Sequence, residues 1–174
     1  SGALFPLTTN RPIMITLTLA VDPGVSGGFA LTDDEGKIVI CEPYRDPDDA
    51  LTYLTLIHAM QKDGVKLHVL IERVSASPIM SPSAAFAFGE NYGWWLGAIA
   101  ASLGIHPTPI APQIWQAPYK DRKQAVLKLP VQQQYHAWKQ TLKQIAQETW
   151  PEQRVTLATA DALLLSLHST RRAV

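Results

Sequence analysis

The chain has little cysteine: Cys41 is the only one among 174 residues. A single thiol excludes an intrachain disulfide and a zinc site built from several thiolates, and it suits a reducing compartment. Long apolar runs are also lacking. The longest, from Trp94 to Ile105, is too short and too rich in Gly, Ala and Ser to cross a bilayer, which takes roughly 20 apolar residues. We therefore predict a cytoplasmic protein with no membrane segment.

Neither sign of charge is in excess. Fifteen basic and fifteen acidic residues give a net charge of zero, so the total gives no argument for a nucleic-acid partner. The distribution is uneven, however. Residues 31–50 carry seven acids against two basic residues, whereas residues 115–147 carry six basic residues against one acid. The second region is the one that could face a polyanion.

Internal repeats, low-complexity linkers and a GxxxxGK[ST] phosphate loop are absent from the sequence as well. With 47% hydrophobic and 17% charged residues, the chain is expected to form one layered domain. Residues 1–13 do not have the pattern of a signal peptide, and Met14 stands just before the first expected strand. We expect residues 1–13 to be an added or disordered extension, and residues 14–174 to form the domain.

Hydrophobic periodicity and turn residues predict an α/β order of elements. Three short strands form an antiparallel meander, and helices then alternate with two further strands, the last at a sheet edge because it is rich in proline. The expected strands are 15–22, 28–32, 37–42, 67–74 and 106–110. Four helices are expected. The first is capped by Asp46 and ends at Gly64, the second spans 84–103 with Ser83 as its cap, and the others span 131–149 and 159–169.

Three acids stand beside core elements. An apolar run ends at Asp22, where a glycine-rich turn follows; Glu72 lies near the end of a buried strand; Asp161 is expected in the first turn of the last helix. A buried carboxylate is costly unless a hydrogen bond, a cation or a metal compensates it. Taken singly, each has an ordinary explanation as a turn residue, a partner of Arg73 or a helix-start acid. Together they offer the oxygens that Mg²⁺ prefers.

The order of three motifs carries a resemblance. VDPGVSGGFAL on the first strand, LIERV on the fourth and ADALLLS at the last helix resemble the RuvC-type Holliday junction resolvases of the ribonuclease H-like superfamily. The resemblance runs from about Ile15 to Ser169. The helix rich in Gly and Ala from Ser83 to Ala101 and the segment from Lys139 to Ala146 are similar to the family's corresponding segments.

The resemblance implies a ribonuclease H-like mixed sheet, three antiparallel strands and then parallel strands, flanked by helices. It also implies a homodimer that makes paired nicks in four-way DNA junctions by two-metal hydrolysis, one ion activating a water and the other stabilising the leaving 3′-oxygen. In residue terms, Asp22, Glu72 and Asp161 would be catalytic and hold Mg²⁺ or Mn²⁺. Lys120, Lys123, Lys139 and Lys143 would contact DNA phosphates, although each of these lysines is equally compatible with a solvated helix face.

The chain departs from this pattern in two places. The family places an acid or histidine three or four residues before the last aspartate, where this chain has Ala158 and Leu157. His168 is a poor substitute, because it lies two turns or roughly 10 Å further along the helix. Ser75 stands where some members carry a junction-wedging aromatic, which leaves Phe86, Phe88, Tyr92 or Trp94 as candidates, although each is better explained as a core residue. The alternative is therefore a weakened or inactive junction-binding protein on the same scaffold.

A nucleotide-binding half of the actin-like or sugar-kinase type is a more distant alternative, since its first hairpin also carries Asp-x-Gly. That fold needs a second phosphate hairpin, and the sequence offers none.

Overall fold

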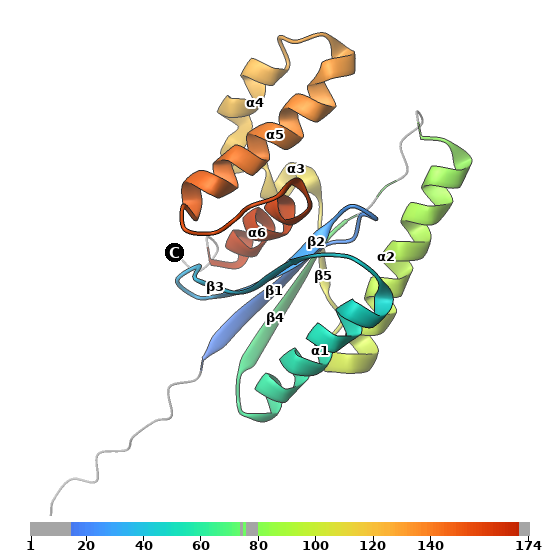
Figure 1. Ribbon diagram of the computed structural model, residues 1–174, viewed down its shortest axis with the longest axis vertical. Coiled ribbons are helices and arrows are strands. Elements are labelled where there is room, and N and C mark those ends of the chain that lie inside the picture. Colours follow the sequence, from blue (N-terminus) through green and yellow to red (C-terminus); the bar gives the residue numbers. More distant parts are fainter. Residues whose placement is uncertain (1–14, 74, 76–79, 171–174) are drawn as a thin grey trace, which may run out of the picture.

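A computed structural model describes residues 15–73, 75 and 80–170 (Figure 1). The prediction for residues 1–13 lies outside this part of the chain. The elements are β1 (Thr16–Asp22), β2 (Gly28–Asp33), β3 (Ile38–Pro43), α1 (Pro47–Lys62), β4 (Lys66–Glu72), α2 (Pro82–Leu103), β5 (Thr108–Ile110), α3 (Pro112–Trp115), the 3₁₀ helix η1 (Ala117–Tyr119), α4 (Lys120–Val126), α5 (Val131–Thr149) and α6 (Leu157–Thr170).

The five strands form one mixed sheet in the order β3-β2-β1-β4-β5. β1 pairs antiparallel with β2, and β2 with β3, whereas β4 runs parallel to β1 and β5 parallel to β4. The predicted α/β fold, with an antiparallel meander followed by parallel strands, is confirmed at this level. The proline-rich strand lies at the sheet edge, as its composition predicts.

Helices cover both faces of the sheet (Figure 1). Side chains alternate along a strand, so Leu17, Leu19 and Val21 of β1 pack with α1 and α2 in one core. Ala20 and Leu70 face the opposite side, where they pack with α5 and α6 in a second core. Within the described residues, no helix is both long enough and apolar enough to cross a membrane.

Helix starts account for most differences from the predictions. Asp46 caps α1 as expected, with its side chain accepting the Asp49 N–H. α2, however, is capped by Ser81, whose hydroxyl accepts the Ala84 N–H at 3.2 Å, and not by Ser83. α6 begins at Leu157, so Asp161 lies in its second turn and not in the first. The short helices α3, η1 and α4 have no counterpart among the predictions.

Candidate active site

Strand register places Asp22 and Glu72 on the same face of the sheet. In the parallel pair of β1 and β4, Ala20 lies opposite Leu70. Asp22 comes two residues after Ala20, and Glu72 comes two residues after Leu70. Because side chains alternate, Asp22 faces the same way as Ala20, and Glu72 the same way as Leu70. Neighbouring strands are about 4.8 Å apart. The two acids are therefore neighbours on the face that α6 covers.

Asp161 reaches the same place from α6. This helix packs across β1 and β2 and is buried from Thr159 to Ser166, so Asp161 is only 2% exposed. All three predicted acids line one cavity of about 590 Å³. The sequence spacing alone does not bring them together; the sheet register and the packing of α6 do.

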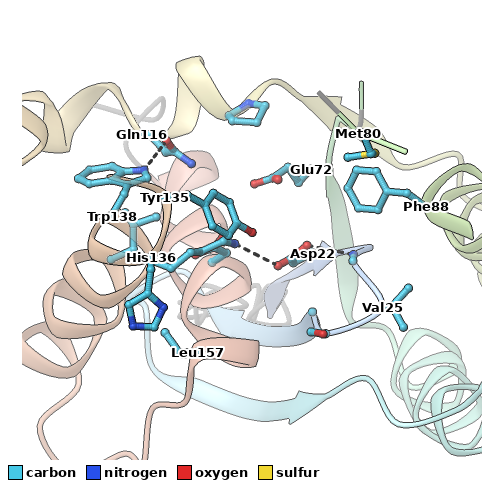
Figure 2. Close-up of a pocket in the computed structure, with 17 residues that line it drawn as sticks. Asp22, Val25, Glu72, Met80, Phe88, Gln116, Tyr135, His136, Trp138 and Leu157 are labelled. Carbon is cyan, nitrogen blue, oxygen red and sulfur yellow. Dashed lines mark hydrogen bonds and ion pairs between the residues drawn. The ribbon is translucent and has the colours of Figure 1, made fainter. Parts of the chain in front are cut away.

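Two walls enclose the cavity. Tyr135, His136 and Trp138 of α5 stand on one side, and Met80 and Phe88 stand on the other, with Asp22 and Glu72 between them (Figure 2). Phe88 is thus the aromatic from the predicted wedge candidates that lines the site. The remaining lining residues are Gly24, Val25, Ser26, Gly27, Pro112, Gln116, Lys139, Leu142 and Leu157.

The glycine-rich turn is built closely around Asp22. Asp22 Oδ1 accepts the Gly24 N–H at 3.1 Å, and Asn91 of α2 donates its side-chain N–H to the Pro23 carbonyl at 2.6 Å. A Cβ on Gly27 would lie 2.8 Å from Asp22 Cγ and would also overlap the Asp22 carbonyl oxygen. The glycine is needed here for close approach and not for an unusual backbone angle.

Gly27→Ala should therefore displace the Asp22 side chain and destabilise the protein, because the added methyl meets backbone atoms that cannot move away. We expect a loss of about 2 kcal/mol in the free energy of unfolding, measured by urea denaturation. Gly93→Ala is the matched control, since nothing lies within 4 Å of a Cβ there. Alanine should stabilise that helix by about 0.5–1 kcal/mol. Equal effects at the two positions would contradict this description of the turn.

Lys139 points into the carboxylate cluster. Its ammonium forms an ion pair with Asp161 Oδ2 and lies 4.0 Å from Asp22 Oδ2. The side chain is 26% exposed. Lys139 was predicted to contact DNA phosphates. In the structure this lysine is the counter-ion of two of the three acids.

Burial and mutual repulsion shift the pKa values of the acids. Desolvation, with the negative charges of Asp22 and Asp161 added, raises the pKa of Glu72 to about 8. Desolvation also raises the pKa of Asp161 to about 6, although Lys139 partly offsets it. Burial disfavours the ammonium of Lys139, but the Asp161 and Asp22 carboxylates outweigh it and raise its pKa. The cluster holds more carboxyl groups than its single cation can neutralise.

The donor set suits a hard divalent cation in kind. Three carboxylates supply oxygen ligands, and Asp161 Oδ1 is buried with no hydrogen-bond partner. In the described part of the chain, no group of three or more acidic, histidine or cysteine side chains is arranged to hold a metal ion as it stands. The Lys139 ammonium takes the place between Asp161 and Asp22 that a cation would occupy. The chemistry of the residues fits Mg²⁺ or Mn²⁺, provided that this ammonium leaves.

The other predicted DNA-contacting lysines lie outside the cluster. Lys120 is exposed at the start of α4, and Lys143 is half-buried one turn beyond Lys139. The Lys123 ammonium lies over the Trp138 ring, 5.2 Å from its centroid, which places it beside one wall of the cavity.

The helix position beside Asp161 is filled by an apolar side chain. Leu157, one turn before Asp161, lines the cavity. The backbone of Ala158 packs closely on β2, since its carbonyl oxygen would lie 2.7 Å from a Cβ added to Gly28. His168 is not among the residues that line the cavity. The fourth ligand that the resemblance implies therefore has no counterpart on the described part of α6.

Sequence reasoning missed Trp115 and Gln116 of the α3 region. Trp115 donates its indole N–H to Glu72 Oε2 at 2.9 Å, and Gln116 accepts the Trp138 indole N–H at 3.1 Å. No periodicity marks a four-residue helix. Lys139 did carry a signal, because it lies within the apolar stripe of α5 formed by Trp138, Leu142 and Ala146.

No model of a known protein family matches the chain, and a search of curated proteins finds no significant match.

Proposed function

We propose that the protein is a metal-dependent DNA endonuclease, and that four-way junctions are its substrate. One observation carries the proposal: Asp22, Glu72 and Asp161, from three separate elements, line one cavity. Scaffold elements that each deliver one carboxylate to a shared site are what two-metal hydrolysis of a phosphodiester requires. The sheet order and the motif resemblance support a ribonuclease H-like identity, and the four-way junction comes from that resemblance.

In this proposal the three acids hold Mg²⁺ or Mn²⁺, and bound ions supply water activation and stabilisation of the leaving oxygen. Glu72 gives up its proton when it becomes a ligand, so metal affinity rises with pH. Lys139 leaves the carboxylates and turns toward the phosphate of the scissile strand. Lys120, Lys123 and Lys143 contact backbone phosphates further along the DNA.

A homodimer is part of the same proposal, because paired nicks need two active sites.

The test is incubation of the chain with a labelled synthetic four-way junction and with a linear duplex of the same sequence, in Mg²⁺, Mn²⁺ or EDTA. We expect paired nicks in the junction alone, with metal alone. Asp22→Asn should lower the rate on the order of 1,000-fold, because it removes one charged ligand and keeps the side-chain shape. Cleavage in EDTA, or unchanged cleavage by Asp22→Asn, would contradict the proposal.

A second candidate is a non-catalytic junction-binding protein on the same scaffold. It is favoured by Lys139, whose ammonium already forms an ion pair with Asp161 beside Asp22, and by Leu157 in place of a polar residue. It predicts junction binding that EDTA does not change, with no cleavage. Leu157→Asp and Ala158→Asp each add a carboxylate one turn before Asp161, and gain of metal-dependent nicking in either would identify a scaffold that has lost a ligand.

A further inference from the structure

The short helix α3 is anchored directly beside Glu72. In the β4–β5 pair, Glu72 lies opposite Ile110, and the Arg73 N–H donates to the Ile110 carbonyl at 2.8 Å. α3 begins two residues later, at Pro112. The strand pairing thus fixes where α3 starts and brings its last residue, Trp115, back over the end of β4.

Trp115 is almost completely buried beside Glu72. Its side chain is 1% exposed and packs in the core between the sheet and the α5–α6 layer. Its indole N–H donates to Glu72 Oε2 at 2.9 Å. An indole can only donate, so it needs an acceptor, and a buried ring that cannot rotate holds that acceptor in one orientation. The hydrogen bond therefore fixes how the Glu72 carboxylate is turned at the cavity.

The next residue makes a matching contact in the opposite direction. Gln116 Oε1 accepts the Trp138 indole N–H at 3.1 Å, and both residues line the cavity (Figure 2). Trp138 immediately precedes Lys139 on α5. Two consecutive side chains thus join the glutamate of the sheet to the helix that carries the lysine.

We propose that Trp115 and Gln116 are positioning residues that hold Glu72 and α5 at a fixed separation across the site. The inference rests on the proposed function, because it assumes that the acids bind metal and that these two hydrogen bonds serve that binding. Trp115 orients the carboxylate, and Gln116 keeps the Lys139 helix from moving relative to it. Partners of this kind around metal ligands typically change metal affinity or activity by 10- to 100-fold.

The hydrogen bond itself is tested without metal or DNA. Trp115→Phe identifies the Trp115 indole N–H resonance in ¹⁵N-labelled, EDTA-treated protein. Glu72→Leu should then shift this resonance and speed its exchange with solvent, because the acceptor is gone. The Trp150 indole, which donates to the Gly36 carbonyl at 2.7 Å, should not move. A Trp115 resonance unaffected by Glu72→Leu would overturn the inference, whether or not the protein is a nuclease.

The positioning role is tested by Mn²⁺ affinity, measured by titration calorimetry. Trp115→Phe should weaken binding about 10-fold or more. Trp150→Phe is the matched control, since it removes an indole hydrogen bond elsewhere, and it should change affinity less than twofold. Gln116→Met and Trp138→Phe should each weaken Mn²⁺ binding, and the double variant should be no weaker than either single one, because both remove the same hydrogen bond.

The outcomes separate this inference from the proposed function. If the wild-type protein binds Mn²⁺ but cleaves no DNA, the proposed endonuclease activity is overturned. The positioning role is then decided by the Mn²⁺ affinities of wild type and Trp115→Phe alone. Mn²⁺ binding that is equally tight in wild type and Trp115→Phe overturns the positioning role even in an active nuclease. Wild-type protein that binds no Mn²⁺ overturns both.

Discussion

Lys139→Met is expected to lower the free energy of unfolding by about 3 kcal/mol at pH 8 in EDTA, because it leaves buried carboxylates without their counter-ion. Asp161, only 2% exposed, then faces Asp22 and Glu72 with no positive charge between them. The loss should be smaller at pH 5, where protonation relieves the repulsion. Urea denaturation followed by tryptophan fluorescence at the two pH values measures the difference.

Lys143→Met is the control for that experiment. Lys143 lies one turn further along α5 and does not line the cavity, so its replacement removes a positive charge without exposing the cluster. Mg²⁺ should restore more stability to Lys139→Met than to wild type, because no ammonium competes for the same carboxylates. Equal losses in the two lysine variants would show that Lys139 does not neutralise the acids.

Glu72→Gln should stabilise the metal-free protein at high pH. The pKa of Glu72 is raised from 4.5 to about 8 in the folded state, so the folded protein keeps a proton that the unfolded chain has lost. Stability therefore falls as pH rises from about 4.5 to about 8, and it stays low above that range. Glutamine is neutral throughout and still accepts the Trp115 N–H. We expect a gain on the order of 3 kcal/mol at pH 9 and little change at pH 4.

Glu148→Gln is the comparison for Glu72→Gln. Glu148 is exposed, and its hydrogen bond to Arg122 lowers the pKa of its carboxyl, so its replacement should give no gain at high pH. The measurement is the free energy of unfolding in EDTA across pH 4 to 9. A flat difference between wild type and Glu72→Gln would contradict the raised pKa of Glu72.

Most of the fold could be predicted because its signals are local. Apolar runs between turn residues located the first three strands, the Asp46 cap located α1, and an amphipathic pattern that stops before Pro151 located α5 from its first residue to its last. The start of α2 was placed wrongly, since Ser81 and Ser83 are equally good caps by composition. The short helices after β5 were missed, because α3 and η1 are too short to show a periodicity. The contacts of Trp115 with Glu72 and of Gln116 with Trp138 cannot be read from the sequence.

The site could be predicted as residue types but not as an arrangement. Asp22, Glu72 and Asp161 stood out because carboxylates at the ends of buried elements need compensation. That Lys139 supplies it depends on how α5 lies against α6, which a single sequence does not specify. The same packing makes Leu157 a lining residue and brings Trp115 to Glu72.

The shared register of β1 and β4 has a consequence for how the gene can change. Because side-chain direction alternates with every residue, a single-codon deletion within β1 would turn Asp22 toward α1 and α2 and bring Leu19 or Val21 to the opposite face. The acid site and the two cores would be lost in the same event. Variants that keep β1 and β4 in register therefore keep Asp22 and Glu72 aligned, so the relative position of these two acids is inherited with the folding of the sheet.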